Sequence, residues 1–361
     1  MSRSLQGGED TGIIFSLYKN TNPPLLLSDA SLSSCGFSWS SSSSSWSDMC
    51  RPAAALLAVL AASLCCGAMD QPLNSRPIIG VLAQESRKNE QATRGFSYIA
   101  ASYVKYLEAA GARVVPVRVN LTEEEYTKIF NSINGLLLPG GSSNLLTSQY
   151  SRAAKILYNL ALKANDASDY FPVWGTCLGF EQLTVLTAKK HLLTLTDTHA
   201  VALSLNFTRR ARSSRLFRSF PKDVLRSLTK ENICPHFHKW SLSTKNFSAN
   251  PTLKKFYKVL STNHDGKQEF ISTMEAYRYP IYGVLWHPEK NPFEWVDKPG
   301  MIHSTAAIRV SFYSASFFVS EAMKNNHSFP SREEEERALI YNFCPVFRGM
   351  DSVFVQSYYF D

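Results

Sequence analysis

Short apolar runs alternate with segments of helical periodicity from Pro77 onward. Three of these runs predict buried strands, because a fully apolar run of this length is typical of a strand that is covered on both faces, and a β-rich run predicts a fourth strand. The strands are expected at 78–83, 113–119, 136–138 and 172–174, and the helices at 99–110, from 122 onward, at 150–164 and at 180–187. Strands that alternate with helices in this way predict a doubly wound, mostly parallel sheet.

Beyond Lys190 the pattern becomes richer in strands. They are expected at 201–207, 255–263, 268–274 and 282–286, with Asp265-Gly266 as a hairpin turn between the second and the third. A long covering helix is expected at 306–325, and Ser331 with Glu334 predicts a capping box for a last helix. The expected fold class is therefore α/β, with a mostly parallel central sheet, flanking helices and additional antiparallel strands.

The N-terminal part of the chain does not follow this pattern. Residues 1–48 contain a serine run and an Asn22-Pro23-Pro24 break, and we interpret them as a non-structural extension. Residues 49–68 have a basic start, an apolar run and small residues up to Ala68, an order typical of a secretory signal peptide, although a buried core helix is the alternative. We therefore expect translation to start at Met49, cleavage near Ala68 and a single domain at 69–361.

The composition of the chain excludes some classes of protein. The chain has 361 residues, a formal net charge of +8 and 7 cysteines, which is enough length for a large core but too few cysteines for a disulfide scaffold. No run reaches the roughly 20 apolar residues of a membrane span. The net positive charge is compatible with nucleic acid, an anionic membrane or an acidic small substrate as partner. Because the basic cluster at 209–215 is interpreted as a solvated loop, we expect no nucleic-acid partner.

Secretion predicts sites of glycosylation and leaves the state of two cysteines open. Four sequons follow the predicted signal peptide, at Asn120, Asn206, Asn246 and Asn326. Cys234 and Cys344 are either free or paired with each other, and the sequence does not decide between these states.

A candidate nucleophile lies in the segment Gly175-Thr176-Cys177-Leu178-Gly179, between a predicted strand and a predicted helix. This is the setting of a nucleophile elbow, here with cysteine in place of serine. Glycine is needed because a sharp turn from strand to helix leaves no room for side chains beside the nucleophile. The helix N-terminus is expected to favour the thiolate of Cys177. The alternative is an inert core cysteine.

A base and an oxyanion site are expected near this cysteine. His287 follows a predicted strand, in a fold whose sites gather at the carboxyl ends of strands. In an extended segment Glu289 would share a face with His287 and could orient its imidazole. The loop Pro139-Gly140-Gly141 follows another strand, where the N–H groups of Gly141 and Leu178 could bind a developing oxyanion. Together these features predict acyl transfer through a thioester.

Three motifs carry a resemblance to a known family: Leu-Pro-Gly-Gly at 138–141, Trp-Gly-Thr-Cys-Leu-Gly-Phe-Glu at 174–181 and Trp-His-Pro-Glu at 286–289. They resemble the class I glutamine amidotransferase fold and, within it, the gamma-glutamyl hydrolases, over about 77–361. In that family the nucleophile falls on Cys177 and the catalytic histidine on His287. The resemblance also implies substrate-side roles for His238, Trp240, Tyr103, Glu181 and Gly140.

The activity that the resemblance implies is hydrolysis of γ-glutamyl bonds in the polyglutamate tails of folates and antifolates. It implies a γ-glutamyl thioester on Cys177, a lysosomal and secreted location and a homodimer, and we expect no cofactor. The acidic compartment that it implies suits this chemistry if Cys177 and His287 work as a thiolate–imidazolium pair. His236 and His238 have the alternate spacing of metal ligands on a strand, but without a third ligand nearby in sequence we expect no metal.

Two other functions remain open at this point. One is a glutamine amidotransferase (glutaminase) module, and the other is a catalytically inactive binding protein of the same fold. The sequence also leaves open whether internal or terminal γ-bonds are cleaved.

Overall fold

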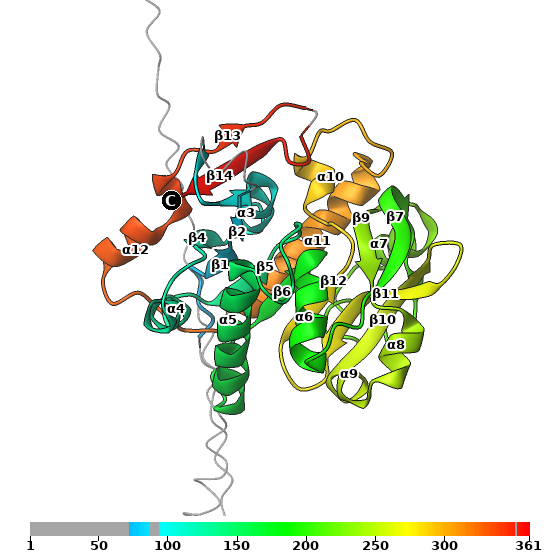
Figure 1. Ribbon diagram of the computed structural model, residues 1–361, viewed down its shortest axis with the longest axis horizontal. Coiled ribbons are helices and arrows are strands. Elements are labelled where there is room, and N and C mark those ends of the chain that lie inside the picture. Colours follow the sequence, from blue (N-terminus) through cyan, green and yellow to red (C-terminus); the bar gives the residue numbers. More distant parts are fainter. Residues whose placement is uncertain (1–71, 87–93, 351) are drawn as a thin grey trace, which may run out of the picture. The chain divides into compact units, whose positions relative to one another are not determined.

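An eight-stranded sheet with the order β4-β1-β5-β6-β12-β11-β10-β8 forms the centre of the fold (Figure 1). The computed structural model describes residues 72–86, 94–350 and 352–361, so the predicted N-terminal extension and signal peptide lie outside the described residues. The strands of this sheet are β1 (Ile78–Leu82), β4 (Arg113–Val117), β5 (Gly135–Leu138), β6 (Val173–Thr176), β8 (Asn206–Phe207), β10 (Tyr257–His264), β11 (Glu269–Ala276) and β12 (Ile281–Val284).

The sheet is parallel in its first five strands and antiparallel in its last three. Successive side chains of a strand pack alternately into two hydrophobic cores: Leu137 packs in one, and Leu136 and Leu138 pack in the other. Because successive side chains of a strand point to opposite faces, a strand covered on both sides needs an apolar residue at every position. The expected fold class, a mostly parallel sheet with added antiparallel strands, is confirmed.

Helices cover both faces of the sheet (Figure 1). One face carries α3 (Ala101–Glu108), α7 (Lys222–Lys230), α10 (Lys290–Phe293) and α11 (Thr305–Ala322). The other carries α4 (Glu123–Phe130), α5 (Gln149–Asp166), α6 (Leu178–Ala188), α8 (Thr244–Ala249) and α9 (Pro251–Phe256). The capping box that opens α4 joins Thr122 and Glu125 in both directions, which explains why the acidic residues 123–125 start a helix. A short helix, α12 (Arg332–Ala338), and a 3₁₀ turn, η1 (Ile340–Asn342), come near the end of the chain.

Two smaller sheets accompany the central one in the described part of the chain. The first has the order β13-β14-β3-β2, from β13 (Val346–Phe347), β14 (Gln356–Phe360), β3 (Ser97–Ala100) and β2 (Gln84–Glu85); the second pairs β7 (Thr194–Leu203) with β9 (Cys234–Ser241). The prediction of one helix over 99–110 was wrong at its start, because Ile99 pairs with Tyr358 of β14. The strand expected at 201–207 was also wrong in extent, since β7 begins at Thr194 and β8 is separate.

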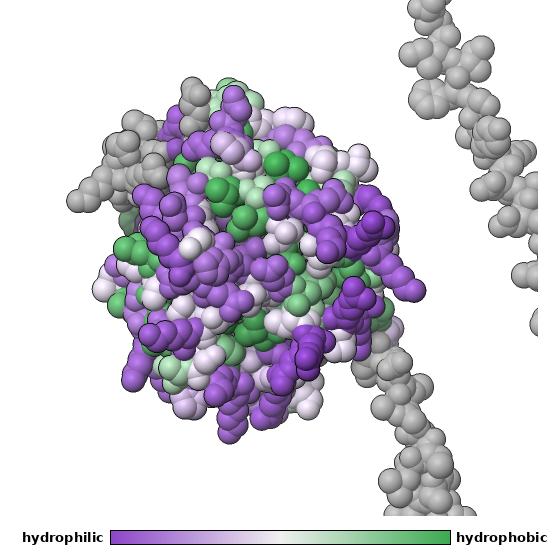
Figure 2. Space-filling view, turned by 90° about the vertical axis from the view of Figure 1, so that its right-hand side faces the viewer, coloured by the Kyte–Doolittle hydropathy of each residue, from purple (hydrophilic) through white to green (hydrophobic). Residues whose placement is uncertain are grey.

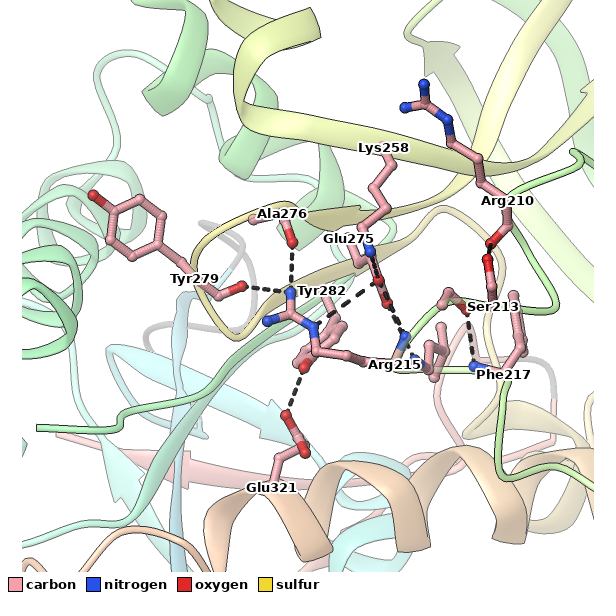
Figure 3. A network of polar contacts seen from close by, with 12 residues as sticks. Arg210, Ser213, Arg215, Phe217, Lys258, Glu275, Ala276, Tyr279, Tyr282 and Glu321 are labelled. Atoms are coloured by element: carbon pink, nitrogen blue, oxygen red, sulfur yellow. Dashed lines mark hydrogen bonds and ion pairs between the residues drawn. The ribbon is translucent and has the colours of Figure 1, made fainter. Parts of the chain in front are cut away.

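The basic cluster at 209–215 is not simply a solvated loop, because Arg215 is anchored in the fold (Figure 3). Its guanidinium donates to the carbonyl of Ala276, and its backbone N–H donates to the buried carboxylate of Glu275 at 3.2 Å. Nζ of Lys258 lies 2.5 Å from the same carboxylate. Such partners are needed because an unpaired buried charge is costly. Arg215 therefore ties this segment to the β10–β11 hairpin.

The side of the molecule that carries β7 and β9 is largely hydrophilic, with apolar residues in small patches (Figure 2). Within the described ranges, no helix has both the length and the apolar character required to cross a membrane.

Candidate active site

Cys177 lies at the sharp turn between β6 and α6, with φ 50° and ψ −106°. L residues rarely adopt a positive φ, so the turn is strained at this residue. The glycines beside it allow close approach: a Cβ on Gly179 would lie 2.0 Å from the carbonyl oxygen of Leu138, and one on Gly175 would lie 2.7 Å from the backbone of Gly179. The predicted need for glycine at both positions is confirmed.

His287 and Glu289 form a buried pair. Nδ1 of His287 lies 2.7 Å from Oε1 of Glu289. The expected contact is present, but its geometry differs from the expectation, because a turn after β12 rather than an extended segment brings the two together. With Nδ1–H donating to the carboxylate, Nε2 carries the lone pair. Nε2 has no hydrogen-bond partner within the described residues, so it is available as a base.

Cys177 and His287 meet at Gly140 of the diglycine loop. A Cβ on Gly140 would lie 2.7 Å from Cε1 of His287 and 3.1 Å from Cβ of Cys177. The loop is held from behind, since the N–H of Gly140 donates to the hydroxyl of Tyr103 and its carbonyl accepts from Nε2 of Gln84, both at 2.7 Å. Cys177 and His287 therefore lie against the same point of the loop, and a glycine is required there.

Tyr103 lies behind this loop and not in the cavity wall, although a substrate-side role was expected. It is 1% exposed, and its hydroxyl is 3.5 Å from Nδ1 of His287 in addition to its bond with Gly140. In this arrangement Tyr103 positions the loop and the imidazole. Gly140 likewise lies outside the residues that line the cavity.

A cavity of about 940 Å³ opens in front of the cysteine. This volume is typical of a small-molecule site. The expected residues in its wall are Cys177, His287, Gly141, Leu178, Glu181, His238 and Trp240. Sequence reasoning missed other lining residues, among them Phe237, Lys239, Lys290, Arg348 and Phe354. Lys290 could have been noticed because it directly follows the His-Pro-Glu motif, whereas Arg348 and Phe354 follow no motif that points to a site.

His238 is in the wall, but both of its ring nitrogens are engaged inside the protein. Nδ1 lies 2.9 Å from the hydroxyl of Thr198, and Nε2 lies 2.8 Å from Nδ1 of His236. Burial holds the pKa of His238 well below its usual value. The two histidines thus bond to each other, and no group of three or more His, Cys, Asp or Glu within the described ranges is arranged to hold a metal ion.

Burial controls the protonation of the reactive pair. It raises the pKa of the Cys177 thiol well above its usual value, and nearby Glu181 and Glu289 raise this pKa further. Burial also lowers the pKa of His287, an effect that Glu289 opposes. The resting site therefore favours a neutral thiol and a neutral imidazole. These directions do not favour a thiolate–imidazolium pair at rest, because burial acts against the effect of the helix N-terminus.

Glu181 lies in the cavity wall in its protonated form. Burial raises its pKa to about 8, so the carboxyl is neutral at neutral and acidic pH. A neutral carboxyl can donate one hydrogen bond and accept others.

The remaining sequence-predicted positions do not line the cavity. Three sequon asparagines are exposed: Asn120, Asn206 and Asn326. The fourth, Asn246, is half-buried, and its Nδ2 donates to the carbonyl of Leu192 at 2.8 Å. Cys234 is buried and Cys344 is exposed, and both are free.

Comparisons with known proteins give matches over most of the chain. A model of the family described as peptidase C26 matches residues 77–289. Gamma-glutamyl hydrolase of Homo sapiens is 55% identical over 313 residues, which cover 85% of this chain and 98% of that protein. Gamma-glutamyl hydrolase of Rattus norvegicus is 56% identical over 288 residues, which cover 80% of this chain and 90% of that protein. Among solved structures, the glutaminase domain of Trypanosoma brucei CTPS with bound acivicin has a TM-score of 0.47 and 13% identity, covering 70% of this chain and 96% of that one.

Proposed function

This chain belongs to the peptidase C26 family, and we propose that it is a cysteine hydrolase that cleaves γ-glutamyl bonds in the polyglutamate tails of folates and antifolates. The observation that carries the proposal is that Cys177 and His287 meet at the diglycine loop and, with Gly141, line a cavity of about 940 Å³. The names of the relatives, gamma-glutamyl hydrolases, supply the bond that is cleaved.

The reaction begins with attack of the Cys177 sulfur on the γ-carbonyl carbon. Nε2 of His287 accepts the thiol proton as the C–S bond forms, and Glu289 stabilises the resulting imidazolium. The N–H groups of Gly141 and Leu178 bind the oxyanion. When the C–N bond breaks, the leaving amine takes the proton from His287, and a γ-glutamyl thioester remains on Cys177.

Water then completes the cycle. Nε2 of His287 removes a proton from the water that attacks the thioester, and this proton returns to the sulfur as Cys177 leaves. Burial lowers the pKa of His287, so its imidazole stays neutral, and able to act as a base, to a lower pH than that of an ordinary histidine. This property suits an acidic compartment.

The cellular setting is part of the same proposal. We infer a signal peptide at 49–68, a catalytic domain at 69–361 and a lysosomal or secreted location, with support from the order of basic, apolar and small residues up to Ala68. N-glycosylation is supported by the three exposed sequons. A homodimer is inferred from the resemblance to the family alone.

A pair of cysteine variants tests the function. Cys177→Ala is expected to abolish release of glutamate from a pteroyl γ-linked diglutamate while its circular dichroism and thermal unfolding stay as in wild type. Cys344→Ala, which removes the exposed free cysteine, is the matched control and is expected to keep full activity. Turnover by Cys177→Ala would overturn the proposal.

Two substrate comparisons refine the same experiment. Glutamine and a γ-glutamyl peptide offered side by side separate the hydrolase from a glutaminase, and we expect turnover of the peptide. The products from a pteroyl pentaglutamate then show whether internal or terminal bonds are cut.

A further inference from the structure

Lys290 is a buried cation in the wall of the cavity, and the mechanism above does not use it. It is the first residue of α10, is 1% exposed, and lines the cavity together with Cys177 and His287. Its Nζ lies 4.4 Å from the ring centre of Phe354 and 5.1 Å from that of Phe237. The side-chain nitrogen thus lies near two aromatic rings, in the wall of the cavity that Cys177 and His287 also line.

The charge of Lys290 has no direct partner in the part of the chain that the structure describes. None of the ion pairs found there includes it, and the single hydrogen bond of its Nζ there, to the carbonyl of Val353, is long at 3.5 Å. Glu289 and Glu294 are near enough for the charge of Lys290 to act on them, in the direction that lowers their pKa values, but neither forms an ion pair with it. Glu289 binds His287 through Oε1, while its Oε2 has no hydrogen-bond partner among the described residues, and Glu294 accepts from the N–H of Val355 at 2.7 Å.

A buried cation in this state is costly to the protein unless something pairs with it. Contacts with aromatic faces offset only part of that cost. Because Lys290 lies in the wall of the cavity beside the nucleophile, the missing anion can arrive with the substrate.

We propose that Lys290 binds the α-carboxylate of the glutamyl residue whose γ-carbonyl is attacked by Cys177. This inference rests on the proposed function. In a γ-linked chain the amine and the γ-carboxyl of that residue are both in amide bonds, so the α-carboxylate carries its only charge. Three carbon atoms separate this carboxylate from the γ-carbonyl carbon, a span of about 5 Å when extended. In an α-linked peptide that carboxylate is absent, so Lys290 selects γ-linked glutamyl substrates.

The test compares two substrates that differ in one group. One is an N-acyl-γ-glutamyl-glutamate, and the other carries an α-carboxamide in place of the α-carboxylate on the acyl-side residue. Wild type is expected to prefer the carboxylate about 100-fold in kcat/KM, since truncating one partner of a buried charge pair has effects of this size. Lys290→Met keeps the length and apolar stem of the side chain. It is expected to lose this preference, mainly through a raised KM on the carboxylate substrate, with the carboxamide substrate changed less than about threefold.

Two further variants sharpen the result. Lys290→Arg keeps the charge and is expected to restore part of the preference. Lys239→Met removes an exposed cation from the same wall and is expected to keep the wild-type ratio, because general positive charge is not what selects the substrate.

The outcomes separate this inference from the function on which it rests. Wild type that cleaves both substrates equally well overturns the role of Lys290, whether or not any variant folds. An equal loss on both substrates in Lys290→Met also overturns it, since that result indicates a role at the sulfur or in packing. Wild type that cleaves neither substrate overturns the proposed function itself.

Discussion

Replacing Gly179 by alanine tests whether the close approach of α6 and β5 places the nucleophile. The added Cβ would lie 2.0 Å from the carbonyl oxygen of Leu138 and 2.7 Å from its carbonyl carbon. Ordinary van der Waals contact begins near 3.4 Å, so the start of α6 and the end of β5 must move apart by the difference, 1.4 Å. The two atoms of Leu138 that the added Cβ would meet belong to the backbone, so they cannot move away as the end of a flexible side chain could.

This displacement would separate the two segments that carry the site, the start of α6 and the loop after β5. Cys177 caps α6, and Gly140 follows β5 by two residues. A misplacement of about 1 Å costs on the order of 100-fold in rate, so kcat/KM of Gly179→Ala is expected to fall about 100-fold. Overpacking of this kind costs about 1–3 kcal/mol, and the free energy of unfolding is expected to fall by that amount.

The assay measures glutamate release from a pteroyl γ-linked diglutamate, together with urea unfolding of the same preparation. Gly266→Ala is the control, because Gly266 has φ +92° in the β10–β11 hairpin and a Cβ there meets nothing within 4 Å. This control is expected to lose about 1 kcal/mol through backbone strain and to keep its activity. Wild-type activity in Gly179→Ala, or an equal loss of activity in both variants, would refute the reasoning.

Three further predictions address protonation, orientation and modification. Glu289→Gln is expected to lower kcat about 100- to 10,000-fold with little change in KM, because an amide cannot stabilise the His287 imidazolium; unchanged steady-state kinetics would contradict this role. Burial raises the pKa of Glu181 from 4.5 to about 8 in the folded chain, so between these pH values the folded chain holds a proton that the unfolded chain has lost. The free energy of unfolding therefore falls by up to about 1.4 kcal/mol per pH unit as the pH rises from about 4.5 to 8. Glu181→Gln is expected to remove that slope in urea unfolding at pH 5 and pH 8, and equal slopes in both proteins would show the carboxyl to be ionised. In protein secreted from animal cells, peptide mapping is expected to find glycans on the exposed sequons but not on Asn246, whose amide donates to Leu192; full occupancy of Asn246 would argue against this geometry.

Local patterns in the sequence predicted the central elements of the fold well. The run Leu136–Leu138 is apolar at every position because it faces two cores, and Thr122 with Glu125 forms the capping box that starts α4. The start of α3 was predicted too early, since Ile99 is held in β3 by Tyr358 from the end of the chain. Helical spacing contains no information about a strand partner so distant in sequence.

The sequence identified the residues of the candidate site better than it predicted their geometry or their protonation. The pairing of His287 with Glu289 was expected, but it comes from a turn. The helix N-terminus suggested a thiolate at Cys177, yet burial, which depends on the whole fold, favours the thiol. Lys290 was overlooked because its burial near two aromatic rings follows from segments far apart in the chain.

The most direct test of the account is to trap the acyl enzyme. Wild-type protein is mixed with excess pteroyl γ-linked diglutamate, quenched in acid during steady-state turnover, digested and analysed by mass spectrometry. We expect the added mass of the acyl group on the peptide that contains Cys177, with the peptides of Cys234 and Cys344 unmodified. An acyl adduct on any other residue, or the same adduct formed by Cys177→Ala, would contradict the central claim that this cysteine is the nucleophile.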